Sequence, residues 1–258
     1  MTTYGVIGVG SIAAAIVTGL CDGVEDPPTV VLSPRNAERA AVLAARLPSV
    51  RVAADNQAVV DDSDVLVVCL LQADTEGVLS GLRFRPDQAV VSAVAGLRVA
   101  HLAELVAPAT EVSRTVPLPA VASRRSVTPV HPATPAVTGL FGRLGGNLVM
   151  EDEAAFETLG TASAAVAAYF RYLGTIADWV AAGGIPQADA RRYVADTFAA
   201  LSGELEAPGA DFAALAGAHA TPGGLNEQFA RDLAEAGVYD AVRAGLDAVF
   251  ARETEGRA

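Results

Sequence analysis

The stretch Tyr4-Gly-Val-Ile-Gly-Val-Gly-Ser-Ile-Ala-Ala-Ala-Ile16 decides what the start of the chain can form. An apolar run leads into glycines with the spacing G-x-G-x-x-A, and an alanine-rich segment follows directly. This order predicts a strand, a tight turn and a helix. Gly8 would allow the sharp turn, Gly10 would let a pyrophosphate approach the backbone, and Ala13 would keep the helix close to the strand. Because a helix N-terminus attracts phosphate, we interpret the stretch as a dinucleotide site, although ordinary glycine-rich turns also match this pattern.

The composition is that of a folded and acidic protein. A chain of 258 residues can form one large domain or two modest ones, and its 52% of hydrophobic residues allow a sizeable core. The net charge of −12 argues against nucleic acid or an anionic membrane as a partner. The chain begins directly with a predicted strand, without the pattern of a signal peptide, and has no uninterrupted apolar run of membrane-spanning length. We therefore expect a cytoplasmic protein.

Two residue types limit the chemistry. Cys21 and Cys69 lie in a predicted helix and a predicted strand, where small buried thiols are expected and a disulfide framework is excluded. The chain contains no lysine, so all 18 basic residues are arginine. A lysine base, a Schiff-base lysine and a P-loop lysine are thereby ruled out. We expect no metal site.

The second predicted strand, at 29–33, ends in Ser33-Pro34-Arg35-Asn36. An acidic residue at this place would bind the ribose hydroxyls of NAD. The sequence instead offers a hydroxyl, a guanidinium and an amide where the 2′-phosphate of NADP would lie, and arginine binds phosphate through two parallel hydrogen bonds. The prediction is therefore NADP. The alternative is that Asn36 only caps the next helix and Arg35 is solvated.

Further strands are predicted at 50–52, 64–71 and 88–94, and two short ones near 112–116 and 126–130. The continuous apolar run at 64–71 is typical of a central parallel strand that is buried on both faces. Strands alternate with helices up to about residue 115, which indicates a Rossmann-like, doubly wound parallel sheet with its ligands at the carboxyl ends of the strands. We assign residues 1–152 to this NADP-binding domain.

From residue 153 to 258 the strand signals stop, and three or four helices are expected. Two adjacent apolar stripes run along residues 161–182, one through Phe170 and Ala177 and the other through Tyr169 and Trp179. One buried face of a surface helix would not need so wide an apolar surface. We therefore predict an all-helical C-terminal dimerisation domain and a homodimer or higher homo-oligomer formed through it.

The last informative segment is Gly217-Ala-His-Ala-Thr-Pro-Gly-Gly-Leu-Asn226, before a predicted helix. Thr221 and the backbone amides of Gly223, Gly224 and Leu225 would form an anion-binding concavity suited to a carboxylate. The alternative is a plain capped turn between two helices. His219 is the one histidine near this loop, and it is a candidate for a catalytic or substrate role.

In its order of motifs, nearly the whole chain resembles the pyrroline-5-carboxylate reductase family. The resemblance rests on G-x-G-x-x-A at the start, Asp55-Asn56, Ser92-Ala-Val-Ala-Gly96, Arg114-Thr-Val-Pro117 and, most specifically, Thr221-Pro-Gly-Gly224 with Glu235-Ala-Gly237. It implies an NADP site formed by Gly8, Gly10, Ser11, Ile12, Ser33, Arg35, Asn36, Asn56, Leu70, Leu71, Ala95, Gly96 and Pro117. It also implies a substrate-carboxylate site formed by Thr221, Gly223, Gly224, Leu225 and Asn226, facing the nicotinamide.

The activity implied is hydride transfer from NADPH to the C=N bond of a small cyclic imine carboxylate, as in proline biosynthesis. Such an imine is basic enough to take its proton from water, and Thr221 or Asn226 would steady its nitrogen. The chain departs from the family pattern at Leu71-Gln72, at the bend Pro117-Leu118-Pro119 and at Leu225-Asn226. These departures cluster around the substrate. They leave open a reductase of a different imine or keto compound in secondary metabolism, or an NADP-binding regulator without turnover.

Overall fold

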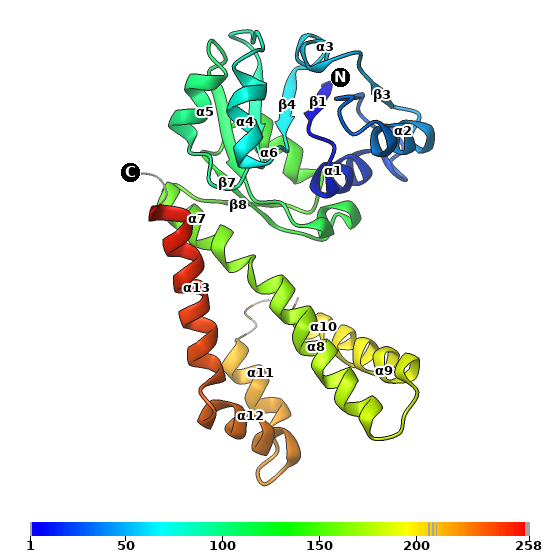
Figure 1. Ribbon diagram of the computed structural model, residues 1–258, viewed down its shortest axis with the longest axis vertical. Helices are drawn as coiled ribbons and strands as arrows, with labels where there is room; N and C mark the ends of the chain where they lie inside the picture. Colours follow the sequence, from blue (N-terminus) through cyan, green and yellow to red (C-terminus); the bar gives the residue numbers. More distant parts are fainter. Residues whose placement is uncertain (1, 206, 208, 210, 256–258) are drawn as a thin grey trace. The chain divides into compact units, whose positions relative to one another are not determined.

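The computed structural model describes residues 2–205, 207, 209 and 211–255. The chain divides into two compact units, Met1–Gly160 and Thr161–Ala258. Unit 1 contains a sheet of eight strands with helices on its faces, and the described part of unit 2 is built from helices (Figure 1). Among the described residues, none of the helices combines the length and the hydropathy that a bilayer span requires.

The sheet of unit 1 has the strand order β3-β2-β1-β4-β5-β6-β7-β8. Strands β1 to β6 are parallel, and their order is that of a doubly wound dinucleotide-binding sheet. Strand β7 runs antiparallel to β6, and β8 runs parallel to β7. The strands are β1 (Tyr4–Ile7), β2 (Val30–Leu32), β3 (Val50–Val52), β4 (Val65–Val68), β5 (Ala89–Ser92), β6 (Glu111–Thr115), β7 (Thr128–His131) and β8 (Asn147–Val149).

Helices cover both faces of this sheet because successive strand residues point to opposite sides. Val6 packs into one core, with α1, α2 and α6, whereas the next residue, Ile7, packs into the other, with α3, α4 and α5. Both side chains are at most 1% exposed, as are those at the centre of β4. The helices of this unit are α1 (Ser11–Cys21), α2 (Ala37–Arg46), α3 (Asn56–Asp61), α4 (Gln72–Leu79), α5 (Val99–Leu105), η1 (Pro119–Ser123, a 3-10 helix) and α6 (Pro135–Gly142).

A buried ion-pair cluster joins β6 to the start of α7 (Glu153–Ala162). Arg114 is 3% exposed, and its Nη1 lies 2.5 Å from Glu153 Oε1 and 3.3 Å from Glu157 Oε1. Its guanidinium carbon lies 4.8 Å from the centre of the Phe156 ring. Positions three and four apart lie on one face of a helix, so α7 presents both carboxylates and the ring to the same guanidinium. Glu153 Oε1 also accepts a hydrogen bond from the Val99 amide, which fixes the start of α5.

The cluster predicts acid sensitivity. Burial by itself would raise the pKa of Glu153, but the Val99 amide and the Arg114 guanidinium outweigh it and hold that pKa below its ordinary value. A lowered folded-state pKa stabilises the protein above the unfolded-state value of about 4.3, and this contribution is lost as the pH falls through the folded-state pKa. We expect the free energy of unfolding to decrease as the pH is lowered past about 4.3. In Glu153→Gln this decrease should be smaller. Urea unfolding at a series of pH values measures it; identical pH profiles for both proteins would contradict the assignment.

Unit 2 is a set of helices with many exposed apolar side chains. Helices α8 and α9 lie side by side (Figure 1). In the turn that connects them, Gly184 has a φ of 95°, a left-handed conformation that suits glycine. Ala177, Ala190 and Val194 are buried, whereas Trp179 is 77% exposed. The helices are α8 (Ala165–Ala182), α9 (Gln187–Ala200), α10 (Ser202–Leu205), α11 (Phe212–His219), α12 (Leu225–Glu235) and α13 (Val238–Glu255).

The structure confirms the fold class and corrects three details. The helix expected over 161–182 is interrupted, because α7 ends at Ala162 and α8 begins at Ala165. The described residues from Glu153 onward contain seven helices, α7 to α13, rather than three or four. The antiparallel direction of β7 and the edge strand β8 were not expected. Apolar patterns locate a strand but carry no information on its direction, which explains the last difference.

Candidate functional site

The first position of the turn between β1 and α1 is a glycine because the backbone conformation and the packing at this point exclude a side chain. Gly8 has a φ of 90°, which side-chain-bearing residues rarely adopt. A Cβ atom at this position would lie 2.4 Å from the carbonyl oxygen of Cys69 on the neighbouring chain segment. The Gly8 amide donates a hydrogen bond to Ser33 Oγ at 3.0 Å, which joins the end of β1 to the end of β2.

The second glycine is different, because no atom of the described residues lies close to the position of its missing Cβ. Gly10 is the N-cap of α1, with φ −90° and ψ −165°, and a Cβ atom there would meet no atom within 4 Å. No side chain of the N-cap residue accepts a hydrogen bond from the first-turn amides, so these amides can donate to a ligand. Open space beside the backbone at a helix N-terminus fits a pyrophosphate. The residues present therefore fit a dinucleotide at this position.

The turn after β2 places the predicted 2′-phosphate residues, but with different partners. Ser33 is 1% exposed, and its hydroxyl accepts the bond from Gly8. The Asn36 side chain donates to the Val9 carbonyl oxygen at 3.1 Å and accepts from the Arg39 amide at 3.4 Å, so it caps α2 as the alternative interpretation expected. Arg35 is 66% exposed and forms an ion pair with Asp74 in the first turn of α4, with a distance of 3.1 Å between Nη1 and Oδ2.

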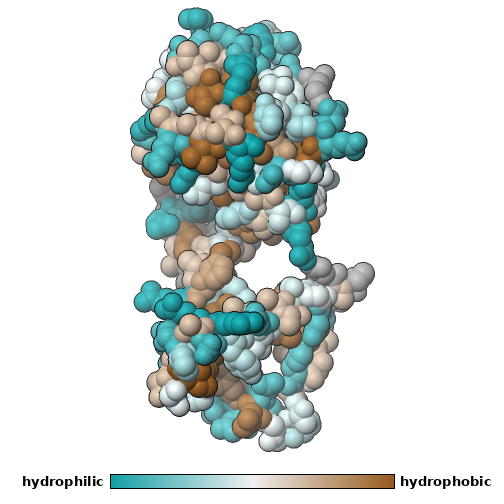
Figure 2. All heavy atoms as spheres, turned by 90° about the vertical axis from the view of Figure 1, so that its right-hand side faces the viewer, coloured by the Kyte–Doolittle hydropathy of each residue, from teal (hydrophilic) through white to brown (hydrophobic). Residues whose placement is uncertain are grey.

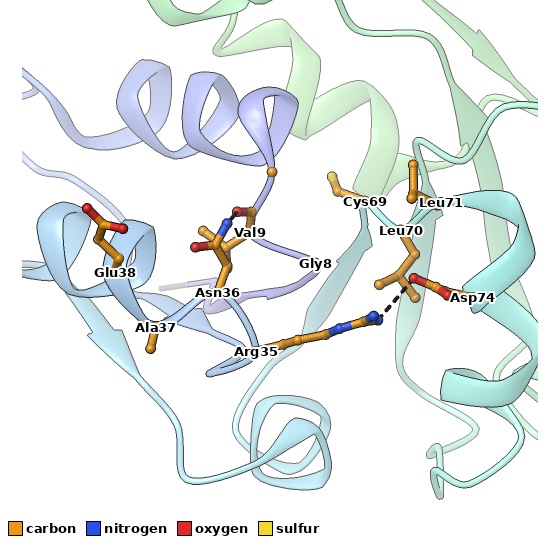
Figure 3. A pocket seen from close by; sticks show the side chains of 11 residues that line it. Gly8, Val9, Arg35, Asn36, Ala37, Glu38, Cys69, Leu70, Leu71 and Asp74 are labelled. Carbon is orange, nitrogen blue, oxygen red and sulfur yellow. Dashed lines mark hydrogen bonds and ion pairs between the residues drawn. The ribbon is translucent and has the colours of Figure 1, made fainter.

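These turns surround a cleft of about 570 Å³ at the carboxyl ends of β1, β2 and β4 (Figure 3). The predicted residues Gly8, Gly10, Arg35, Asn36, Leu70 and Leu71 line it. Sequence reasoning missed Val9, Ala37, Glu38, Cys69 and Asp74, which also line it. Burial raises the pKa of the Cys69 thiol to about 12, so the thiol is neutral near pH 7. Val9, Ala37 and Cys69 are each next to a predicted residue, whereas Glu38 and Asp74 lie in the first turns of α2 and α4.

Other predicted cofactor residues lie outside the lining of this cleft. Ser11 and Ile12 form the first turn of α1, and Asn56 is the first residue of α3. Ala95 and Gly96 follow β5, and Gly96 has a φ of 77°. A Cβ atom on Gly96 would lie 2.9 Å from Gln72 Oε1, so the side chain at the start of α4 packs on this turn. Pro117 is buried, two residues after the end of β6.

The predicted substrate loop forms the turn between α11 and α12 in unit 2. Gly223 has a φ of 74°, a left-handed conformation that glycine adopts readily. Its amide donates to Glu227 Oε2 at 2.7 Å, and the Gly224 amide donates to the Thr221 carbonyl oxygen at 2.8 Å. Two of the three backbone amides of the expected carboxylate site therefore donate to acceptors of their own loop. A glutamate at the third position of a helix was the available signal.

Two of the three residues with predicted catalytic roles, Asn226 and His219, have hydrogen-bond partners near this loop. Asn226 Nδ2 donates to the His219 carbonyl oxygen at 3.0 Å. The His219 ring places Nε2 2.9 Å from Glu204 Oε2. His219 is the last residue of α11, Thr221 lies in the turn, and Asn226 is the second residue of α12. Leu225, the first residue of α12, is 85% exposed.

Comparison with known proteins matches both parts of the chain. Residues 3–96 match the family model "NADP oxidoreductase coenzyme F420-dependent", and residues 153–256 match "Pyrroline-5-carboxylate reductase dimerisation". The pyrroline-5-carboxylate reductase of Mycobacterium tuberculosis (strain ATCC 25618 / H37Rv) is 26% identical over 289 residues, covering 99% of this chain and 97% of the relative. The chain belongs to the pyrroline-5-carboxylate reductase family.

Solved structures of pyrroline-5-carboxylate reductases share the fold. The enzyme of Streptococcus pyogenes superposes with a TM-score of 0.84 at 23% identity, covering 98% of both chains. The pyrroline carboxylate reductase of Plasmodium falciparum, solved with NADP bound, gives a TM-score of 0.81 at 14% identity and covers 98% of this chain and 97% of the other.

For this member of the pyrroline-5-carboxylate reductase family, the comparisons give the class of activity. It is an NAD(P)-dependent reductase of an NADP-binding family, and it carries the family's dimerisation region. The cleft residues from Gly8 to Asp74 all lie inside the first matched segment. Among the described residues, no group of three or more His, Cys, Asp or Glu side chains could hold a metal ion.

Proposed function

We propose that this protein reduces the C=N bond of a small cyclic imine with NADPH, and that pyrroline-5-carboxylate, the substrate of proline biosynthesis, is the first compound to test. The observation that carries the proposal is the cleft at the carboxyl ends of β1, β2 and β4. It combines open space at Gly10, a helix N-terminus and a guanidinium after β2. These features suit a pyrophosphate and a 2′-phosphate respectively.

In this proposal the protein contributes orientation rather than a strong acid. NADPH, when bound, supplies the hydride that adds to the imine carbon. Gly10 and the first turn of α1 hold the pyrophosphate, Arg35 holds the 2′-phosphate, and the apolar side chains of Leu70 and Leu71 cover the cleft. The imine nitrogen is protonated in water before reduction, so the absence of a lysine is no obstacle. Thr221 orients the substrate, and His219, itself oriented by Glu204, is the candidate group that contacts the protonated imine.

The experiment follows loss of the NADPH absorbance band in the presence of cyclic imines. Pyrroline-5-carboxylate and its carboxylate-free counterpart 1-pyrroline are compared at equal concentration. Turnover of either ring supports an imine reductase. Tight NADPH binding without turnover of any imine would favour the regulatory interpretation, and failure to bind NADPH would contradict the proposal altogether.

Arg35 gives a direct test of the cofactor assignment. Arg35→Ala removes one charge-assisted hydrogen-bond partner of the 2′-phosphate, which is expected to weaken NADPH binding by about 1.5–3 kcal/mol. NADH lacks this phosphate, so its affinity should change little. Fluorescence titration of both cofactors against the wild type and the variant measures the difference. An equal loss for NADPH and NADH would contradict the role given to Arg35.

A second candidate function, reduction of an imine without a carboxylate, is favoured by Glu227. Its carboxylate already accepts the Gly223 amide at 2.7 Å, where a substrate carboxylate was expected. A second anion at this amide would meet electrostatic repulsion, whereas a protonated imine would be attracted. Under this interpretation the wild type prefers 1-pyrroline to pyrroline-5-carboxylate in kcat/KM. Glu227→Gln should shift that preference toward the carboxylate; an unchanged ratio would remove Glu227 from substrate selection.

For the domain organisation and assembly we propose an NADP-binding domain at 1–152 and a dimerisation and substrate domain at 153–258. Support for a homodimer comes from the exposed apolar side chains of unit 2, several of which Figure 2 shows in brown on its visible face. Phe170, Trp179 and Phe212 are each at least 65% exposed. So much exposed apolar surface is typical of an association site. Light scattering at micromolar concentration tests this, and a monomeric mass would contradict it.

A further inference from the structure

The ion pair across the cofactor cleft points to a residue that sets cofactor selectivity. We infer that Asp74 lowers the preference for NADPH over NADH, because its carboxylate competes with the 2′-phosphate for Arg35. The inference rests on the proposed function, in which Arg35 binds that phosphate. It adds a specificity-determining residue from a part of the chain that the cofactor pattern of the sequence does not include.

The two partners reach the cleft from opposite sides. Arg35 comes from the turn between β2 and α2, and Asp74 comes from the first turn of α4, after β4. Figure 3 shows the Arg35 side chain extended toward α4, where its guanidinium meets the Asp74 carboxylate. Arg35 Nη1 lies 3.1 Å from Asp74 Oδ2, so the two side chains form both a hydrogen bond and an ion pair. Both residues line the same cleft.

The charge balance of the cleft makes this contact consequential. Its lining contains one cation, Arg35, and two carboxylates, Glu38 and Asp74. Glu38 points away from Arg35 in Figure 3, so Asp74 is the carboxylate that meets the guanidinium. A second guanidinium, that of Arg39, lies 3.5 Å from Ser11 Oγ at the start of α1. Arg39 is therefore at the pyrophosphate end, and Arg35 alone of the lining residues offers a positive charge to a 2′-phosphate.

The two cofactors differ at the position where this pair lies. NADPH carries a phosphate of about −1.5 to −2 charges on the adenosine ribose, by analogy with other phosphate monoesters, and NADH carries a hydroxyl there. The phosphate must take the guanidinium from Asp74 and then lie near that carboxylate, whereas the hydroxyl leaves the pair intact. Because the side chains are 66% and 39% exposed, the pair yields to the phosphate, and Asp74 adjusts selectivity without abolishing NADPH binding.

The test is the dissociation constant of each cofactor, measured by fluorescence titration, for the wild type and Asp74→Asn. Asparagine keeps the size of the side chain and removes its charge. We expect NADPH to bind about three- to tenfold more tightly, a tenfold change being about 1.4 kcal/mol. NADH should change less than about twofold, since no ion pair has to be broken for it. The gain in NADPH affinity should shrink at high salt, as screening of exposed charges requires.

Two further variants make the result specific. Glu76→Gln removes the same charge from an exposed position two residues further along α4, and it should leave the ratio of the two dissociation constants unchanged. In the Arg35→Ala background, Asp74→Asn should bring no selective gain for NADPH, because the residue it acts through is gone. Circular dichroism of each variant checks that the fold is retained.

Three outcomes would overturn the inference. Unchanged NADPH affinity in Asp74→Asn would show that the carboxylate does not compete. A selective loss of NADH affinity would show that Asp74 accepts the ribose hydroxyls instead. An equal gain in NADPH affinity in Glu76→Gln would show that the effect comes only from the change in net charge. Failure of the proposed function is distinguishable, because then the wild type itself binds neither cofactor or reduces no imine.

Discussion

Gly10→Ala is expected to abolish tight NADPH binding while the protein stays folded. The added methyl group meets no atom of the residues that the structure describes within 4 Å, and the backbone at this position has a φ of −90°, which alanine adopts readily. The space it fills is the space in which the pyrophosphate would approach the first turn of α1. Loss of one or two charge-assisted hydrogen bonds of about 1.5–3 kcal/mol each gives a decrease in affinity on the order of a hundredfold. The change at the N-cap itself should cost about 1 kcal/mol or less in stability.

Gly8→Ala is the matched control, because Gly8 lies only two residues away but is required by its backbone conformation. Gly10, in contrast, leaves space in which a ligand can approach. Alanine at Gly8 must adopt a φ of 90° and place its Cβ 2.4 Å from the Cys69 carbonyl oxygen. Such strain costs about 1–3 kcal/mol and shows as a lower melting temperature. Thermal unfolding and NADPH titration of both variants separate the roles. The assignment fails if Gly10→Ala binds NADPH like the wild type, or if it loses as much stability as Gly8→Ala.

Arg114→Met is expected to be the most destabilising single change described for this protein. Arg114 is 3% exposed and is shared by Glu153 and Glu157, of which the second has a side chain that is 7% exposed. Methionine keeps much of the length of the side chain but removes the guanidinium that Glu153 and Glu157 both contact. Removal of one partner from a buried ion pair typically costs about 3–5 kcal/mol. Urea or thermal unfolding followed by circular dichroism measures the loss.

Arg46→Met provides the comparison for this experiment. Arg46 lies 3.9 Å from Asp22, and both side chains are more than half exposed, so the loss should stay below about 1 kcal/mol. A similar small loss in Arg114→Met would show that solvent or another group replaces the guanidinium. Because both carboxylates belong to α7, a large loss would also show that the fixing of this helix on β6 contributes to the stability of unit 1.

Much of the cleft at the carboxyl ends of β1, β2 and β4 was predictable from local sequence. Gly8 and Gly10 are two residues apart, and the segment that contains Arg35 follows a strand whose β-branched residues mark it clearly. Local patterns of this kind fix backbone conformation at a turn, and the known order of parallel strands then brings the turns together. For the same reason Val9, Ala37 and Cys69 come into the cleft with their predicted neighbours.

The partners of these residues could not be predicted in the same way. Arg35 and Asp74 are 39 positions apart, and the latter looks like an ordinary acidic residue in the first turn of a helix. Arg114 and Glu153 are also 39 positions apart, and their contact depends on where α7 returns to the sheet. At the substrate loop, the Thr-Pro-Gly-Gly pattern predicted a turn correctly, but the Gly223 amide proved to be bonded to Glu227.

By itself the sequence determined where the chain turns, which strands are buried on both faces and where a phosphate can approach the backbone. These features depend on the conformational freedom of glycine and on the two-residue repeat of a strand, which are local properties. The tertiary structure decided which charges face each other: Arg35 with Asp74, and Arg114 with Glu153 and Glu157. Ion pairs between distant segments depend on the packing of whole elements, and no local pattern specifies that packing.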